Sequence, residues 1–194
     1  MKQADLTRER LLRAGFELFT AQGYRATTTS DIARHAGVAE GALYRHFPGK
    51  QALLNEVYRN AAAWAAERVR EADAAAESLP HKLAHLASAL VRGAGREPAV
   101  VRLFFFQGHT TLLDERARTA AREFRGGLEG LVAQGKADGL VRSGGVDALA
   151  AAWLGVVRVA MERIVTREWG TNSGGVTVCR EAAWAAIAKP QSPG

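Results

Sequence analysis

Apolar residues recur every three to four positions along most of this chain, which is the spacing of an amphipathic α-helix. In the first such segment, residues 7–22, Leu11, Ala14, Leu18 and Phe19 share one side of the predicted helix. No stretch of useful length alternates apolar and polar residues as a half-buried strand does. Glycine and proline divide the chain into about nine predicted helices, so the pattern predicts an all-α protein.

Residues 28–50 predict two short helices joined by a tight turn. Thr28 suits the N-cap of the first helix, and Gly37 suits the left-handed residue that ends it. The second helix, 39–47, turns Leu43 toward a core. On its outer side we expect Ala39, Glu40, Gly41, Ala42, Tyr44, Arg45 and His46.

This arrangement is a helix-turn-helix, whose second helix fits the major groove of DNA. Small residues such as Gly41 let the helix backbone approach the base edges, and Tyr44 and Arg45 can reach phosphates. Glu40 has two interpretations: its carboxylate accepts a hydrogen bond from cytosine N4, or it only complements the helix dipole.

The same segment resembles the DNA-binding domain of the tetracycline-repressor (TetR) family of bacterial transcriptional regulators. The resemblance covers GYRATTTSDIARHAGVAEGALYRHFPGKQALL, residues 23–54. Its matching positions are Gly23, Thr28, Ile32, Ala33, Ala36, Gly37, Val38, Leu43, Tyr44, Phe47, Lys50 and Leu53. The resemblance implies phosphate contacts from Thr28, Tyr44, His46 and Lys50, and base contacts around Ala39, Glu40 and Gly41.

We expect a three-helix DNA-binding head over residues 1–52 and a larger helical bundle over 53–190 for ligand binding and dimerisation. Residues 51–77 contain neither glycine nor proline and predict one long helix, which the resemblance identifies as the connector that moves when an effector binds. Further helices are expected over 78–95, 97–107, 114–137, 147–169 and 176–188. Gly126, Gly127 and Gly130 in the segment 114–137 indicate close packing, a kink or room for a ligand.

The last two predicted helices are apolar around much of their circumference, so each requires burial on more than one side. Either the chain's own core is thick there, or a second copy covers them in a four-helix bundle. The resemblance implies the dimer. The candidate interface residues are Trp153, Val156, Val157, Ala160, Ile164, Val178, Ala182 and Ile187.

The resemblance also implies a small-molecule pocket in the body. Its candidate lining residues are Trp64, Phe104, Phe105, Gln107, His109, Phe124, Trp153 and Met161, although an aromatic cluster also suits an ordinary core. Such a lining favours a small hydrophobic effector, which Gln107, His109 or Arg158 can orient.

Composition narrows the classes of protein. The net charge of +6 favours a polyanionic partner, and the single cysteine, Cys179, excludes an intrachain disulfide. Cys179 suits either a small buried residue or a redox sensor. The charged N-terminus lacks the apolar part of a signal peptide, and no apolar run is long enough for a membrane span, so we expect a cytoplasmic protein.

No motif of an enzyme or a cofactor site occurs in the sequence, so we expect neither catalysis nor a cofactor. His81 and His85 have the spacing of a metal-binding pair but lack an obvious third ligand, and no metal site is expected. The sequence therefore predicts a homodimeric repressor that a small molecule releases from operator DNA. The alternatives are an architectural DNA-binding protein and a small helical metal enzyme.

Overall fold

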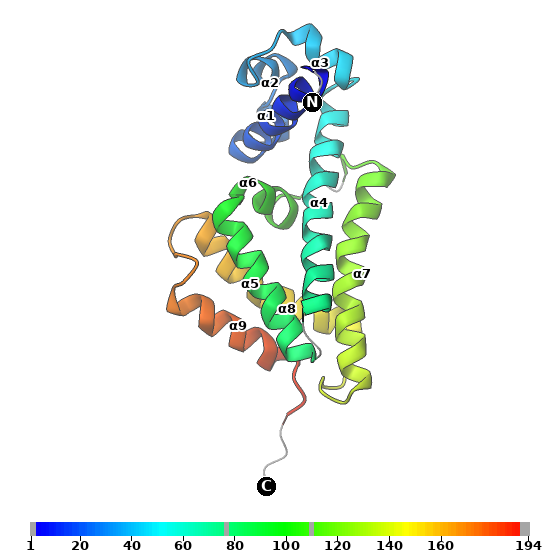
Figure 1. Cartoon of the computed structure of the whole chain (residues 1–194), viewed down its shortest axis with the longest axis vertical. Coiled ribbons are helices and arrows are strands. Elements are labelled where there is room, and N and C mark those ends of the chain that lie inside the picture. The colour runs from blue at the N-terminus through cyan, green and yellow to red at the C-terminus, as the bar shows by residue number, and fades with distance from the viewer. Residues whose placement is uncertain (1–2, 76–77, 109–110, 191–194) are drawn as a thin grey trace.

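The computed structural model describes residues 3–75, 78–108 and 111–190, which form nine α-helices and one π-helical turn (Figure 1). The head contains α1 to α3, α4 runs from the head into the body, and the remaining helices build the body. The bounds are α1 Gln3–Ala26, α2 Thr29–His35, α3 Glu40–His46, α4 Lys50–Ala75, α5 Leu79–Arg96, α6 Pro98–Val101, η1 Arg102–Phe106, α7 Glu115–Ala137, α8 Val146–Val165 and α9 Gly174–Ile187.

Local signals set the helix ends of the head. Thr28 caps α2 in a capping box with Asp31, and Gly37 adopts φ +66° in the turn before α3. Gly23 breaks the helical conformation inside α1 with φ +81°, where the sequence predicts the end of the first helix. A short helical segment follows this break through Ala26, which the hydrophobic pattern did not predict.

The head has its own core, in which α1, α2 and α3 pack against the start of α4. Leu11, Phe19, Ile32 and Leu43 are fully buried there. Ala42 is also buried, at 5% exposure, which corrects its expected place on the outer side of the second helix. It lies beside Leu43 on the inner face of α3, so it offers no surface to DNA.

α4 is shared between the two cores. Its first half, through Ala62, packs in the head cluster, and its second half, from Ala65, packs in the body cluster. Its 26 residues span roughly 39 Å at the helical rise of about 1.5 Å per residue. The division at residue 52 therefore remains a prediction, because one continuous helix carries the chain across it.

The body is a bundle in which α7 lies along α4, and α5 packs between α4 and the pair α8 and α9 (Figure 1). Trp153 and Met161 of α8 are among its largest fully buried side chains. Cys179 of α9 is buried too, and burial raises the pKa of its thiol. Among the described residues, the only strand-like pairing is an isolated antiparallel bridge between Val141 and Ala188.

The predicted helix over 97–107 is instead a short α6 followed by the π-helical turn η1. Such a turn accommodates an extra residue, and π-helical turns occur frequently at functional sites. Here it carries Leu103, Phe104 and Phe105 into the space between head and body. Phe104 packs against both core clusters, so η1 connects them.

Substitutions at two helix glycines are expected to have opposite effects on stability. A Cβ at buried Gly93 would overlap the indole ring of Trp64, so Gly93→Ala forces α4 and α5 apart and should lower the free energy of unfolding by about 1–3 kcal/mol. Gly126 has nothing within 4 Å of its Cβ position, so Gly126→Ala should raise that free energy by about 0.5–1 kcal/mol. Urea denaturation measures both, and equal stabilities would contradict this packing.

Candidate nucleic-acid interface and body cavity

The outer face of α3 carries the residues expected to approach DNA. Ala39, Glu40, Gly41 and Tyr44 are exposed, and His46 is half-buried. Tyr44 is an aromatic side chain left 54% exposed, although burial of such a ring is favourable. The fold thus brings these residues onto one surface at the end of the head, while α1 and α2 pack against α3 (Figure 1).

Thr29, which the sequence analysis did not select, organises this surface. Its hydroxyl donates to Oε1 of Glu40 at 3.0 Å and lies 3.2 Å from the hydroxyl of Tyr44. Since the single Thr29 proton is directed to Glu40, Tyr44 donates to Thr29. The bridge holds one carboxylate oxygen of Glu40 and leaves the other available, and no sequence signal indicated it because it joins two different helices.

Thr28 is exposed, but its hydroxyl is engaged within α2. It donates to Oδ2 of Asp31 at 2.6 Å and accepts from the Asp31 amide at 3.1 Å. These Thr28 hydrogen bonds, with smaller contributions from Arg34, hold the pKa of Asp31 below its ordinary value. The capping box is therefore the role of Thr28 in this structure, and a phosphate contact from it remains a prediction.

The side chain of Lys50 is directed toward the backbone of the head and does not extend outward as a phosphate contact would require. Its Nζ donates to the carbonyl oxygens of Tyr24 at 2.8 Å and Thr27 at 2.7 Å, and it lies 4.2 Å from the centroid of the Tyr24 ring. These contacts bind the start of α4 to the turn between α1 and α2. Lys50 thus stabilises the head in this structure, whatever contact it makes with DNA.

Lys50→Met is expected to lower the free energy of unfolding by about 2 kcal/mol, because two charge-assisted hydrogen bonds are lost at a half-buried site. The matched control is Arg45→Gln, which removes an exposed charge from α3. The control should keep its stability and lower the slope of log affinity against log salt by about 1. Urea denaturation and a salt series of DNA binding separate the two; an unchanged stability of Lys50→Met would refute this role.

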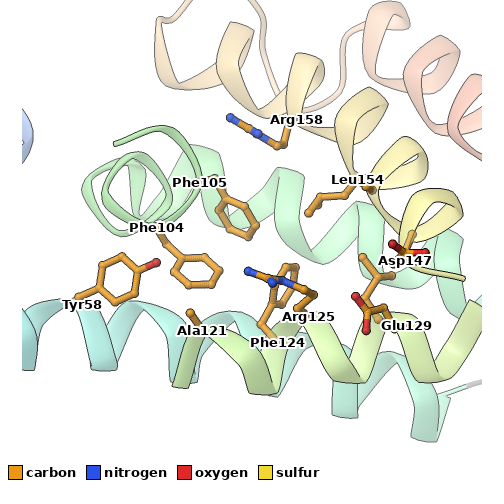
Figure 2. Close-up of a pocket in the computed structure, with 13 residues that line it drawn as sticks. Tyr58, Phe104, Phe105, Ala121, Phe124, Arg125, Glu129, Asp147, Leu154 and Arg158 are labelled. Atoms are coloured by element: carbon orange, nitrogen blue, oxygen red, sulfur yellow. The ribbon is translucent and has the colours of Figure 1, made fainter. Parts of the chain in front are cut away.

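The body contains a cavity of about 260 Å³ between α4, η1, α7 and α8 (Figure 2). Three of the predicted lining residues, Phe104, Phe105 and Phe124, lie in its wall. Their rings form a T-shaped cluster with centroids 4.8 to 5.5 Å apart. The remaining lining residues are Tyr58, Ala121, Arg125, Leu128, Glu129, Asp147, Ala150, Ala151, Leu154 and Arg158.

The structure does not bring the other predicted lining residues to this cavity. Trp153 and Met161 lie in the body core, at 1% and 0% exposure. Trp64 packs against Gly93, and Gln107 turns toward the head, where its Nε2 donates to the Thr20 carbonyl at 3.3 Å. His109 lies outside the described residues. Trp153 and Met161 lie on the apolar face of α8 that points into the bundle, so their apolar character alone did not distinguish core residues from cavity residues.

The polar residues of the cavity were largely missed. Only Arg158 was considered as a group that orients an effector. Tyr58 follows Leu54 by four residues, which places it on the inner face of α4, and this spacing is the signal that could have identified it. Burial raises the pKa of Tyr58 while Arg125 acts in the opposite direction, so its hydroxyl stays a donor at neutral pH.

The predicted dimer residues divide into two groups. Trp153, Val157, Ala160, Ile164 and Ile187 are buried inside the chain's own bundle, so they offer no surface to a second copy. Val156 is half-buried, whereas Val178 and Ala182 are exposed. Val159, not selected from the sequence, is 46% exposed and Val178 is 64% exposed. An accessible apolar face on α8 and α9 thus remains. It contains Val159, Val178 and Ala182, whereas most of the predicted interface residues are buried.

Metal-ligand geometry is absent from the described part of the chain, where no three His, Cys, Asp or Glu side chains gather as a metal site requires. Nδ1 of His81 instead lies 2.8 Å from the Ser78 hydroxyl oxygen.

None of the described helices has the length and apolar character needed to cross a membrane.

Comparison with known proteins shows similarity in the head and the start of α4. Residues 11–57 match the family described as bacterial regulatory proteins, tetR family. The HTH-type transcriptional regulator SrpR of Pseudomonas putida is 47% identical over 55 residues, which are 28% of this chain and 26% of SrpR. The HTH-type transcriptional repressor KstR2 of Mycobacterium tuberculosis is 38% identical over 69 residues, 36% of this chain and 34% of KstR2. The chain thus spans about a quarter to a third of these curated relatives.

Solved structures match nearly the whole chain. A TetR family transcription regulator from Marinobacter aquaeolei VT8 aligns with a TM-score of 0.83 at 19% identity, over 96% of this chain and 97% of that one. The regulator FadR from Bacillus subtilis, solved in complex with stearoyl-CoA, aligns with a TM-score of 0.74 at 19% identity, over 92% and 97%. At such identities the likeness establishes the fold of head and body together.

Proposed function

We propose that this chain is a homodimeric transcriptional repressor that a small molecule releases from operator DNA, because residues 11–57 match the family of bacterial regulatory proteins described as tetR. The observation that carries the proposal is the exposed face of α3, supported by a helix-turn-helix core and held in place by Thr29. The protein acts by binding rather than catalysis, and its DNA target places it in the bacterial cytoplasm.

Contact with DNA is proposed to occur through α3 in the major groove. Ala39 and Gly41 leave room for base edges, and Glu40, oriented by Thr29, accepts from a cytosine N4 amino group. Tyr44, Arg45 and His46 contact phosphates, with Thr28 and Lys50 at the edge of the surface. The phosphate contacts supply affinity for any sequence, whereas Glu40 supplies preference among sequences.

Dimerisation is proposed through the accessible face of α8 and α9. Val159 and Val178 stand exposed there beside the small residues Ala152, Gly155 and Ala182, which permit close helix approach. Two such pairs of helices form an intermolecular four-helix bundle with two-fold symmetry. The dimer sets the separation of the two α3 helices, which must be about 34–36 Å to enter successive turns of the major groove.

The effector is proposed to bind the cavity between α4, η1, α7 and α8. Phe104 of η1 lines this cavity and packs against both the head and the body cores. Its ring centroid lies 5.5 Å from that of Tyr58 in α4. Gln107, at the end of η1, bonds to the backbone of α1. An effector that favours a different position of Phe104 therefore shifts α1 and α4 together, and it acts by its differential affinity for the two arrangements.

Binding of the purified chain to its own upstream DNA and to a scrambled duplex, across a salt series, tests the function. A preference of at least about 10³ for one duplex supports an operator-specific repressor. Equal and steeply salt-dependent binding to every duplex tried, including fragments selected from genomic DNA, would point instead to an architectural protein that recognises only the phosphate backbone.

A further inference from the structure

The cavity of the body contains two arginines without acidic partners. Among the described residues, Arg125 and Arg158 form no ion pair or side-chain hydrogen bond, and Arg158 instead lies 5.1 Å from the centroid of the Phe106 ring. In Figure 2, both guanidinium groups point toward the side of the cavity that holds Tyr58 and Phe104. Both arginines are exposed residues, and an anion that reaches both of them gains charge-assisted hydrogen bonds.

Arg125 has an acidic neighbour available and does not use it. Glu129 lies four residues later on α7, the spacing at which Arg13 and Glu17 form an ion pair of 3.2 Å elsewhere in this chain. The Arg125 side chain turns instead toward the aromatic cluster, whereas Glu129 and Asp147 lie together at the other end of the cavity (Figure 2). The cavity is therefore polarised, with cations and a phenol hydroxyl on one side and carboxylates on the other.

The wall between these ends is apolar. Phe104, Phe105 and Phe124 present ring faces and edges, and Leu154 faces them from α8 (Figure 2). Aromatic edges and faces of this kind pack favourably against another ring or a short alkyl chain. The cavity volume of about 260 Å³ lies near the lower end of the range of about 300–1,000 Å³ that is usual for ligand pockets.

We propose that the cavity binds a small monocarboxylic acid with an aromatic or short alkyl body, whose carboxylate is held by Arg125 and Arg158. The Tyr58 hydroxyl lies on the same side as a further donor. Glu129 and Asp147 repel a second carboxylate at the other end, so the site selects a monoacid over a diacid. This assignment rests on the proposed role of the cavity as the effector site and names the chemical class of that effector.

Calorimetric titration of the full chain with phenylacetate, phenylacetamide and phenethylamine tests the proposal, because these probes share one ring and differ in charge. Phenylacetate is expected to bind with a dissociation constant between about 1 μM and 1 mM, and at least about 10-fold more tightly than the neutral amide. Benzoate, 4-phenylbutyrate and hexanoate extend the series in length and body type.

Arg125→Gln and Arg158→Gln should each weaken phenylacetate binding at least about 10-fold and leave phenylacetamide binding nearly unchanged. Arg142→Gln is the matched control, since Arg142 is an exposed arginine outside the cavity, and it should bind phenylacetate as the unaltered chain does. Thermal melts without ligand verify that each variant folds.

The outcomes separate this inference from the proposed function. Tighter binding of phenethylamine, equal binding of amide and acid, or no binding of any acid at about 10 mM would overturn the monoacid assignment. If operator-specific DNA binding is nevertheless observed, the regulator survives and only the effector class is wrong. Acid binding that depends on both arginines, in a chain that binds no DNA specifically, would support the site and contradict the regulator.

Discussion

If the proposed dimer forms through α8 and α9, replacing both Val159 and Val178 with glutamate is expected to separate it and to lower operator affinity at least about 100-fold, without unfolding the chain. Both valines are largely exposed in the single chain, at 46% and 64%, so the substitution opens no cavity in its core. In a two-fold interface the change places four carboxylates against one another in a surface that loses water. A single head then holds only one half-site, and the affinity gained from tethering the second is lost.

Light scattering of the purified variant gives its mass, and fluorescence anisotropy with operator DNA gives its affinity. The matched control replaces Ala63 of α4 and Ala133 of α7 with glutamate, since both are exposed helical positions away from α8 and α9. The control should keep the dimer mass and lose little operator affinity. If the Val159 and Val178 variant remains a dimer, the interface lies on another surface.

Asn55→Leu is expected to lower the free energy of unfolding by about 3 kcal/mol. Asn55 is only 4% exposed, its Nδ2 donates to the Gln51 carbonyl at 3.0 Å, and its Oδ1 accepts from the Asp114 amide at 2.8 Å. Leucine has a similar size but leaves the Asp114 amide at the start of α7 without its acceptor, and an unsatisfied buried group costs about 1–3 kcal/mol. The cap that starts α7, in which Asp114 accepts from the Ala117 amide, is loosened as well.

Urea denaturation measures this loss, and the melting temperature should fall by roughly 6–12 °C for a chain of this size. Gln51→Leu serves as the control because Gln51 donates to the Leu112 carbonyl at 3.0 Å from an exposed position, where water replaces the bond. It should cost less than about 1 kcal/mol. If the two substitutions lower the free energy of unfolding equally, the hydrogen bond between Asn55 and the Asp114 amide does not stabilise the contact of α4 with α7.

The helices and the helix-turn-helix were predictable because their signals are local. Thr28 as a cap, Gly37 as a left-handed turn residue and the spacing of Ile32 and Leu43 each depend on residues within one or two turns. The fold class was confirmed for the same reason. Ala42 was placed wrongly because the buried arc of a short helix depends on how closely α1 and α2 approach it, which periodicity does not specify.

The site residues in the body could not be predicted from local signals. Phe104, Phe105 and Phe124 were selected with Trp153 and Met161 for the same apolar character, yet only the first three face a cavity. Each side chain lies on an inward face. The π-helical turn η1 carries Phe104 and Phe105 away from the path of an α-helix, and the packing of α7 beside η1 brings Phe124 to the same cavity wall. Arg125 of α7 and Arg158 of α8 likewise line one cavity although they are far apart in the sequence.

The sequence by itself therefore determined the all-α class, the limits of most helices and the DNA-binding head, because hydrophobic spacing and helix caps act over a few residues. Only the tertiary structure decided which residues are core, cavity or open surface, and which polar groups meet, including Thr29 with Glu40 and Lys50 with the Tyr24 backbone. The physical reason is that burial and hydrogen bonding between helices depend on their relative rotation and distance, which packing of the whole bundle sets.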